Sequence, residues 1–408
     1  MQRIIKAAVD RGASDVHIKA GDVFRARING ELVPLTRQAL TPEQTRAIAL
    51  DLIRNEEDRK RIDTITDYDC GWGAQGIGRF RVNILRQRGS FAIVMRVIPF
   101  EVPTVEQLKL PPVLTKIAQV ERGMVLVTGV TGSGKSTTMA ALVNYINTTE
   151  NRHIITLENP IEFLHRDMKS SLTQREIGAD TESFKMGLRA ALRQDPDVIM
   201  IGEMRDAETI DTAIKAAETG HLLISTLHTP DAISTIMRIM AMFPPQEQAV
   251  VRIRLAESLH AVISQRLLPR ADGKGRIAAA EILVVTPTIR DLIVDGGNLP
   301  EIRDYMTDGR EQYGMQTFDQ HLTELVLSGE VSYEVAHANA SKPSDFELQM
   351  RTFGGMAKNS VRGGAAGAGS GGGSAKGGAN ATARPAAAQT ATAPADNGFG
   401  SGLDFLDP

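Results

Sequence analysis

Apolar and polar residues alternate along several short runs in the first hundred residues. The runs Val16–Lys19 and Phe24–Ile28 have this period of two, which is typical of strands with one buried face. Asn29-Gly30 follows the second run and is a strong hairpin signal, since both residue types tolerate positive φ. Phe80–Leu85 and Phe91–Ile98 indicate two further strands. We therefore expect a small α+β domain over residues 1–98.

A proline-rich segment follows, and after it the period changes. Prolines at 99, 103, 111 and 112 indicate a semi-rigid linker with little helix over residues 99–112. From 113 to 350, strand-like and helix-like runs alternate, which predicts an α/β domain with a mostly parallel sheet covered on both faces. The strand candidates are 124–128, 153–157, 197–201 and 222–227, and the helix candidates are 136–147, 182–194, 206–218 and 231–240. Beyond about residue 245 the pattern becomes mainly helical.

The C-terminal residues 351–408 differ in composition from the rest of the chain. Residues 354–398 contain no aromatic residue and are rich in Gly, Ala, Ser, Thr, Asn and Pro. Such a segment cannot bury enough apolar surface to offset the entropy lost on ordering, so we predict a disordered linker. Phe399 and Leu403–Asp407 form a terminal acidic and hydrophobic cluster, which is either a frayed end or a tethered docking motif.

A glycine-rich loop carries the clearest chemical signal. Gly129–Ser136 fits the Walker A pattern G-x-x-x-x-G-K-[ST] without a mismatch, and it lies between the apolar run 124–128 and a predicted helix. An ordinary glycine-rich turn would not need these flanks, whereas phosphate binding does, because backbone N–H groups and the helix dipole must face the anion. Lys135 adds a full charge, and the Ser136 hydroxyl is placed to ligate Mg²⁺. The residues predicted to bind ATP here are Gly129, Thr131, Gly132, Ser133, Gly134, Lys135, Ser136 and Thr137.

Carboxylates follow two of the predicted strands. Glu203 comes after the run 197–201, and Gly202 occupies the place of the usual Walker B aspartate. A carboxylate at the C-terminal end of a strand beside the P-loop can reach Mg²⁺ or the attacking water, whereas a solvated loop glutamate would do neither. Glu158 follows the run 153–157, with Glu162 close behind. We predict Glu203 and Glu158 as catalytic residues and Ser136 with Glu203 as metal ligands, a purely structural role for Glu158 being the alternative.

Histidines and arginines add candidates. His221 and His228 flank the run 222–227, where a histidine often serves only a structural hydrogen bond. The strand period places Arg79 and Arg81 on one face, and Arg96 follows nearby. A stripe of charge is usually a solvated face, but arginines can also be presented to a nucleotide, as in arginine-finger designs.

The composition of the chain excludes or disfavours several classes of protein. The 408 residues suffice for two or three domains, and a net charge of −3 does not indicate a nucleic-acid partner. The single cysteine, Cys70, excludes an intramolecular disulfide and a cysteine-based zinc site. No secretory signal is evident, and the longest apolar runs, such as Ile277–Val285, are too short to span a bilayer. We expect a soluble, cytoplasmic protein without direct membrane insertion.

Together these segments resemble the PilT/PilU branch of the type II and type IV secretion ATPases over about residues 1–350. The motifs that carry the resemblance are Ala13–His17, Arg27–Leu32, Arg79–Asn83, the Walker A loop, Ile154–His165, Leu192–Asp206 and Gly220–His228. Their number and order make a chance match implausible.

The resemblance implies an N-terminal PAS-like domain and a RecA-like ATPase domain, assembled as a hexameric ring. It implies that ATP with Mg²⁺ binds between the two domains and that Arg79, Arg81 and Arg96 approach the nucleotide. For His228 it implies a role in sensing the γ-phosphate or in coupling subunits. In this branch hydrolysis turns an inner-membrane platform protein, which disassembles and retracts the type IV pilus and so drives twitching motility.

The retraction branch is favoured because two features of the assembly branch are missing from the sequence. Extension and secretion ATPases usually carry an extra N-terminal domain and a four-cysteine zinc module. This chain begins almost at the PAS-like domain and has one cysteine, which favours retraction over assembly.

Departures from the family pattern leave alternatives. Asn159 stands where the family usually has aspartate, which removes a negative charge near the metal and is expected to slow hydrolysis. The motif A-I-R-x-L-I-R-E is reduced to Thr288–Asp295, and Gly314–Gln320 looks more like the PilU version. The alternatives are an accessory PilU-like or weakly active regulatory subunit that works with a paralogous retraction ATPase and, less favoured, an assembly or secretion ATPase. The mildly acidic composition disfavours nucleic-acid translocation.

Overall fold

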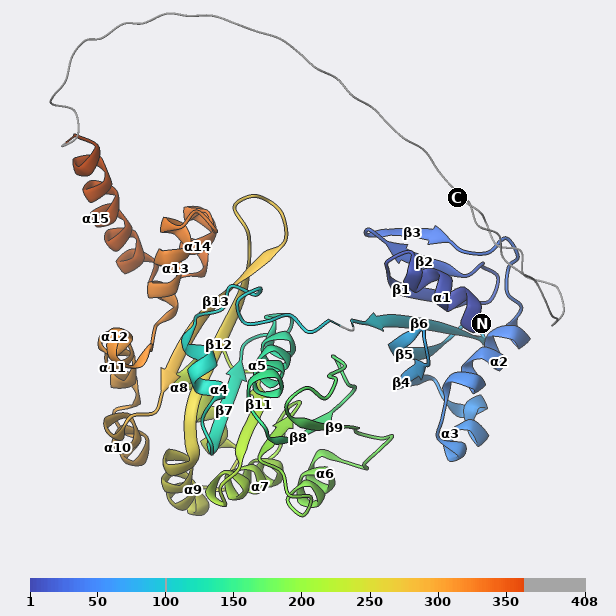
Figure 1. Ribbon diagram of the computed structural model, residues 1–408, viewed down its shortest axis with the longest axis horizontal. Coiled ribbons are helices and arrows are strands. Elements are labelled where there is room, and N and C mark those ends of the chain that lie inside the picture. Colours follow the sequence, from blue (N-terminus) through green and yellow to red (C-terminus); the bar gives the residue numbers. More distant parts are fainter. Residues whose placement is uncertain (100, 363–408) are drawn as a thin grey trace, which may run out of the picture.

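A computed structural model describes residues 1–99 and 101–362, and the chain forms two separate β-sheets (Figure 1). The first sheet has the strand order β3-β2-β1-β6-β5-β4, and every neighbouring pair in it is antiparallel. Its elements are α1 (Gln2–Asp10), β1 (Ala13–Lys19), β2 (Arg25–Ile28), β3 (Glu31–Pro34), α2 (Pro42–Leu52), α3 (Glu56–Lys60), η1 (Ile62–Thr64), β4 (Asp67–Ala74), β5 (Gly78–Gln87) and β6 (Ser90–Ile98).

The N-terminal sheet confirms the four strands and the hairpin predicted for this region. Asn29 and Gly30 have φ values of 52° and 88°, so they form the two-residue turn that pairs Ile28 with Glu31. Along β5, Phe80, Val82 and Ile84 are buried, whereas Arg79 and Arg81 lie on the opposite, more exposed face. The alternation therefore places two arginines on the side of the sheet that does not form the N-terminal core.

The second sheet has seven strands in the order β13-β12-β7-β11-β10-β8-β9. All neighbouring pairs are parallel except β12 with β13. The elements up to α8 are α4 (Val113–Ala118), β7 (Gly123–Thr128), α5 (Lys135–Thr149), β8 (His153–Glu158), β9 (Ser171–Glu176), α6 (Phe184–Ala191), β10 (Val198–Ile201), α7 (Ala207–Glu218), β11 (Leu222–Leu227) and α8 (Ala232–Ala241). The predicted mixed α/β fold is confirmed, including the four strands and four helices expected between residues 124 and 240.

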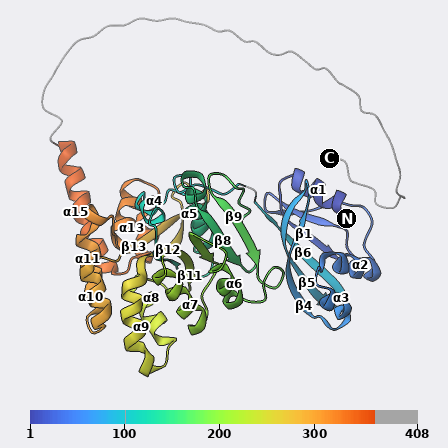
Figure 2. The same ribbon diagram turned by 60° about the horizontal axis from the view of Figure 1, so that its bottom comes forward.

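Helices cover both faces of this sheet (Figure 2). Met124 and Leu126 of β7 face one core cluster, to which α6, α7 and α9 contribute. Val125 and Val127 face the other, to which α4 and α5 contribute. Because β7 is buried on both faces, its residues 124–127 are all apolar rather than alternating.

The prediction that the chain becomes mainly helical beyond residue 245 is wrong for two segments. β12 (Leu259–Pro269) and β13 (Arg276–Val284) are long strands that complete the sheet beside β7. Most of their side chains are buried, so the apolar run carries no period that separates a strand from a buried helix. The other elements here are helical: α9 (Pro245–Ser258), α10 (Pro287–Asp295), η2 (Leu299–Glu301), α11 (Ile302–Asp308), α12 (Arg310–Tyr313), α13 (Phe318–Leu327), α14 (Tyr333–Asn339) and α15 (Pro343–Arg362).

The segment that joins the two sheets packs against the core of the second sheet. Residues 101–112 form turns without a helix, and Val105 and Leu110 are buried in the same core cluster as α4 and α5. Residues 351–362, the start of the segment predicted to be disordered, belong to α15. The predicted terminal docking motif lies outside the described residues. Within residues 1–99 and 101–362, no helix has the length and apolarity needed to cross a membrane.

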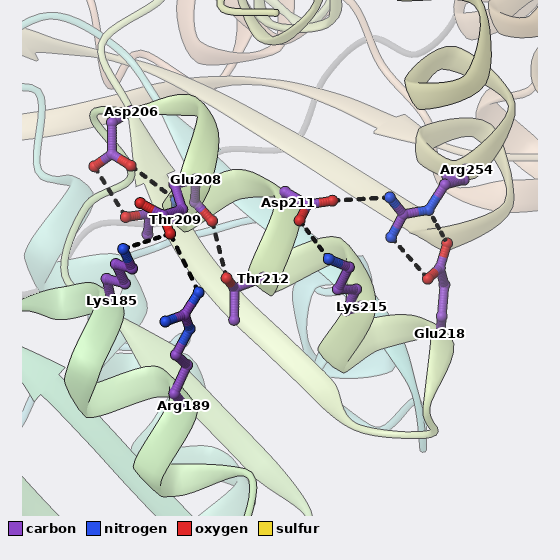
Figure 3. A network of polar contacts seen from close by, with 10 residues as sticks. All are labelled: Lys185, Arg189, Asp206, Glu208, Thr209, Asp211, Thr212, Lys215, Glu218 and Arg254. Atoms are coloured by element: carbon purple, nitrogen blue, oxygen red, sulfur yellow. Dashed lines mark hydrogen bonds and ion pairs between the residues drawn. The ribbon is translucent and has the colours of Figure 1, made fainter. Parts of the chain in front are cut away.

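A network of charged side chains ties together the helices on one face of the second sheet (Figure 3). Arg254 of α9 donates to Glu218 at 2.7 Å and to Asp211 at 2.8 Å, both on α7. Lys185 and Arg189 of α6 pair with Glu208 at the start of α7. Hydrogen bonds to both carboxylates raise the pKa of Arg254, so the guanidinium stays charged. Helix α7 is therefore held from both sides.

A buried glutamate on β13 makes the stability of the fold depend on pH. Glu281 is 3% exposed and accepts a 2.9 Å hydrogen bond from the N–H of Ala232 at the start of α8. Burial raises the pKa of Glu281 from 4.5 to about 7, although the Ala232 hydrogen bond opposes this. Below pH 4.5 the Glu281 carboxyl is protonated in both the folded and the unfolded chain, and above about pH 7 it is ionised in both. Between these pH values the folded chain binds the proton more tightly than the unfolded chain does. Stability is therefore lost as the pH rises through this window.

We expect Glu281→Gln to be more stable than wild type at pH 8 by about 1–3 kcal/mol, because the amide keeps the acceptor oxygen without the charge. The difference should vanish towards pH 4.5, where Glu281 is protonated. Melting temperatures of both proteins across this pH range test the prediction, with the exposed Glu301→Gln as a control that should show no such trend. A wild type as stable as the variant at pH 8 would contradict it.

Candidate active site

The glycine loop between β7 and α5 has a backbone that requires glycine. Gly129, Gly132 and Gly134 have φ values of 144°, 78° and 92°, which other residues rarely adopt. A Cβ on Gly129 would lie 2.5 Å from both the carbonyl oxygen of Gln265 and Oγ of Ser133. The loop therefore passes so close to β12 that only a residue without a side chain fits.

Lys135 begins α5 and lies in the centre of this loop. Its Nζ donates to the carbonyl oxygens of Gly129 and Val130, both at 2.9 Å, and the residue is only 8% exposed. Burial lowers the pKa of Lys135, and the Glu203 carboxylate opposes that shift. The buried Oγ of Ser133 has no hydrogen-bond partner among residues 1–99 and 101–362. A buried ammonium and an unpaired hydroxyl on a glycine loop suit the oxygens of a polyphosphate.

A cavity of about 710 Å³ opens in front of the loop. Residues from both halves of the chain line this cavity. Arg81 and Arg96 belong to the N-terminal sheet, and the other lining residues belong to the strands, loops and helices of the second sheet's domain. Among the residues predicted from the sequence, the structure brings together here Thr131, Gly132, Gly134, Lys135, Ser136, Thr137, Glu158, Glu203, His228, Arg81 and Arg96. Gly129, Ser133 and Arg79 are not part of the lining.

Glu203 sits at the end of β10, where two hydrogen bonds fix the turn. The N–H of Gly202 donates to the carbonyl of Leu157, and Thr226 donates to the carbonyl of Gly202 at 2.7 Å. The Glu203 side chain is 15% exposed, pairs with Arg205 and lies 3.7 Å from Nε2 of His228. Burial, followed by the charge of Lys135, lowers the pKa of His228 against the effect of Glu203, which favours the neutral imidazole.

Glu158 ends β8 and is nearly inaccessible to solvent. Its carboxylate accepts from Thr156 at 2.7 Å, from Gln174 at 3.1 Å and from the N–H of Glu162 at 3.2 Å. Burial raises the pKa of Glu158 despite these three donors. The next residue, Asn159, is exposed and also lines the cavity.

The arginines of the N-terminal sheet have separate partners. Arg81 lies 3.6 Å from Glu162, and both side chains are about half exposed. Arg96 donates to Asp15 at 2.9 Å and helps to hold the pKa of that carboxyl below its usual range, against the effect of burial. Arg79 points elsewhere and pairs with Glu176 at 2.6 Å. Its predicted contact with nucleotide remains a prediction.

Several lining residues were not identified from the sequence. Arg276 enters from β13 and Leu267 from β12, the segments for which strands were not predicted. Phe184 of α6 also contributes. His165 lines the cavity with a pKa lowered by burial to about 4, so its ring stays neutral. The only sequence signal that included His165 was the family-like segment Ile154–His165, and no local signal marked Arg276, Leu267 or Phe184.

Two side chains that line the cavity carry oxygen atoms suited to ligate a magnesium ion. The hydroxyl of Ser136 and the carboxylate of Glu203 both line it, and both are hard ligands. Within the described part of the chain, no three His, Cys, Asp or Glu side chains are grouped to hold a metal.

A glycine loop at the C-terminal end of a parallel strand, with a buried lysine and facing carboxylates, defines a P-loop ATPase. The family described as Type II/IV secretion system protein matches residues 1–337. The chain therefore belongs to this family of ATPases.

Individual relatives agree with this membership. The chain is 43% identical over 352 residues to the type IV pilus ATPase PilU of Pseudomonas aeruginosa, covering 86% of this chain and 91% of PilU. It is also 43% identical to the pilus retraction ATPase PilT of the same organism, covering 84% and 98%. A crystal structure of the retraction motor PilT with bound ADP superposes with a TM-score of 0.77 at 43% identity, covering 85% and 99%. Legionella pneumophila ATPase DotB gives 0.73 at 30% identity, covering 82% and 93%.

Proposed function

We propose that this protein is a Mg-ATP-hydrolysing motor that powers retraction of type IV pili and hence twitching motility. It acts as a homohexamer on the cytoplasmic face of the inner membrane, where it drives a platform protein. One observation carries the proposal: Arg81 and Arg96 of the N-terminal sheet line the P-loop cavity together with residues of the second sheet's domain. The similarity to PilT over nearly its whole length supports it.

The geometry suggests how hydrolysis is converted into movement. Lys135, whose Nζ lies inside the glycine loop beside the carbonyls of Gly129 and Val130, holds the β- and γ-phosphate oxygens. Arg81 and Arg96 draw the N-terminal sheet towards the charge of ATP and release it when phosphate leaves. Ser136 and Glu203 would hold Mg²⁺, which would supply Lewis-acid stabilisation of the phosphate charge.

The carboxylates carry the chemical step in this proposal. Glu203 orients the attacking water near the γ-phosphate and accepts its proton, and neutral His228 beside it senses that phosphate. Glu158, desolvated and held by three donors, fixes the polar end of the cavity and is a second proton acceptor.

An accessory role is the second candidate. The identity to PilU equals that to PilT, and Asn159 lines the cavity where the family motif usually has a carboxylate. In that case the chain turns over ATP slowly and works with a paralogous retraction ATPase. An assembly or secretion ATPase is less favoured.

The test is the number of pili per cell, counted by electron microscopy in a strain with Lys135→Ala at the native locus. Excess surface pili with lost motility support the retraction motor. Normal piliation supports the accessory role. Bald cells overturn both in favour of assembly.

Asn159→Asp is expected to raise ATP turnover about two- to tenfold, because it restores a negative charge beside the metal site. Steady-state hydrolysis by the purified protein measures this. Asn151→Asp, an exposed asparagine before β8, is the matched control and should leave turnover unchanged. Turnover that is unchanged or lower in Asn159→Asp would mean that the asparagine does not limit hydrolysis.

A further inference from the structure

Glu176 connects the two sheets. It is the last residue of β9, at the edge of the second sheet, and only 3% of it is exposed. Its carboxylate accepts from the N–H of Gly71 on β4 at 2.8 Å and from Arg79 on β5 at 2.6 Å. Both donors belong to the N-terminal sheet, so this is a buried, charge-assisted contact between the two halves of the molecule. We call Gly71, Arg79 and Glu176 the latch.

The same strand also holds the loop that carries Glu158. The Glu176 carboxylate accepts from the N–H of Ile161 at 3.3 Å. Two residues earlier, on the same face of β9, Gln174 donates to Glu158 at 3.1 Å and to the carbonyl of Phe163 at 2.9 Å. The first part of the loop after β8 is therefore fixed at Ile161 by Glu176 and at Phe163 by Gln174.

The packing at Gly71 leaves no room for a side chain. A Cβ there would lie 2.5 Å from both carboxylate oxygens of Glu176. At Gly73, two residues further along the same strand, the nearest atoms to a Cβ would be at 3.7 and 3.9 Å, which is ordinary contact. The close approach is therefore confined to the point where the strand meets the carboxylate.

We propose that Glu176 is a positioning residue that couples the placement of the N-terminal sheet to the loop carrying Glu158. When the latch is closed, the N–H of Ile161 is held and Glu158 stays against the cavity. When the N-terminal sheet moves away, the carboxylate loses two of its three partners and the loop is released. Arg79 then serves the latch rather than the nucleotide. The catalytic part of this inference rests on the proposed role of Glu158 in hydrolysis.

Hydrogen exchange of the purified full-length chain tests the coupling without any need for turnover. Gly71→Ala displaces the Glu176 carboxylate from within the other sheet, so amides of residues 158–165 should exchange about tenfold faster. Arg79→Gln should have the same effect without changing any backbone contact. Gly73→Ala is the matched control and should leave exchange unchanged. Unchanged exchange at 158–165 in both Gly71→Ala and Arg79→Gln, with β10 and β11 still protected, would overturn the coupling.

Kinetics separate a latch from a nucleotide contact. Each of the two variants should lower kcat about tenfold and leave KM for ATP within about twofold, since the latch does not line the cavity. Arg79→Lys should restore part of the loss, and the double variant Gly71→Ala/Arg79→Gln should be no slower than either single one. A raised KM with unchanged kcat in Arg79→Gln would show that Arg79 binds nucleotide and would overturn its assignment to the latch. Because none of these readouts involves pili, failure of the retraction proposal leaves them interpretable.

Discussion

Lys135→Ala is expected to lower kcat for ATP hydrolysis by about 10³-fold, the largest effect of any single substitution in this chain. Lys135 is the only lysine that lines the cavity among the described residues, and its ammonium is already held inside the glycine loop. Alanine removes the full positive charge that faces the phosphates while leaving the glycines and the start of α5 in place. Steady-state release of phosphate by the purified protein measures the loss.

The control for this prediction is Lys169→Ala. Lys169 is exposed, its Nζ donates to the carbonyl of Thr149, and it does not line the cavity. Turnover of this variant should match wild type. If Lys135→Ala kept a tenth or more of the wild-type rate, the phosphate-binding role of the loop would be refuted.

Glu203→Gln is expected to lower kcat by about 10²–10³-fold while nucleotide affinity changes by less than about threefold. Glutamine has nearly the same shape but carries no charge and accepts no proton from water. The loss therefore falls on the chemical step rather than on binding. The Glu203 carboxylate opposes the lowering of the His228 pKa, so the variant should also shift the pKa of His228 further down.

Glu208→Gln is the matched control for Glu203→Gln. Glu208 lies on α7, pairs with Lys185 and Arg189, and does not line the cavity. Single-turnover rates and binding of a fluorescent ATP analogue separate the chemical step from affinity. If Glu203→Gln turned over normally and Glu158→Gln did not, the role of proton acceptor would pass to Glu158.

The parts of the fold that follow from the sequence are those with local signals. The loop Gly129–Ser136 could be predicted because its glycines are needed at their own positive φ angles. β8 and β11 could be predicted because they are short apolar runs bounded by polar turns. β12 and β13 could not, since strands buried on both faces have no period of two. β9 escaped notice because it is polar, and it is stabilised by its partner β8 rather than by its own composition.

The residues of the candidate active site also fall into those that the sequence could predict and those that it could not. Lys135, Glu158 and Glu203 each follow a strand or loop that is visible in the sequence. Alternation along β5 placed Arg79 and Arg81 correctly on one face, but it could not indicate that Arg79 meets Glu176 while Arg81 reaches the cavity. That difference depends on how the two sheets meet.

The position of β7 in the middle of its sheet affects how the chain folds during translation. On the ribosome the N-terminal sheet can form as soon as residues 1–98 emerge, because all its strands lie within that segment. β7 appears next, but its two neighbours are β11 and β12, which are synthesised much later. The apolar strand before the P-loop thus lacks both of its neighbouring strands through much of translation, which leaves its backbone edges open to mispairing. A nascent chain halted before residue 259 contains the complete Walker A motif but not the strand that completes its site.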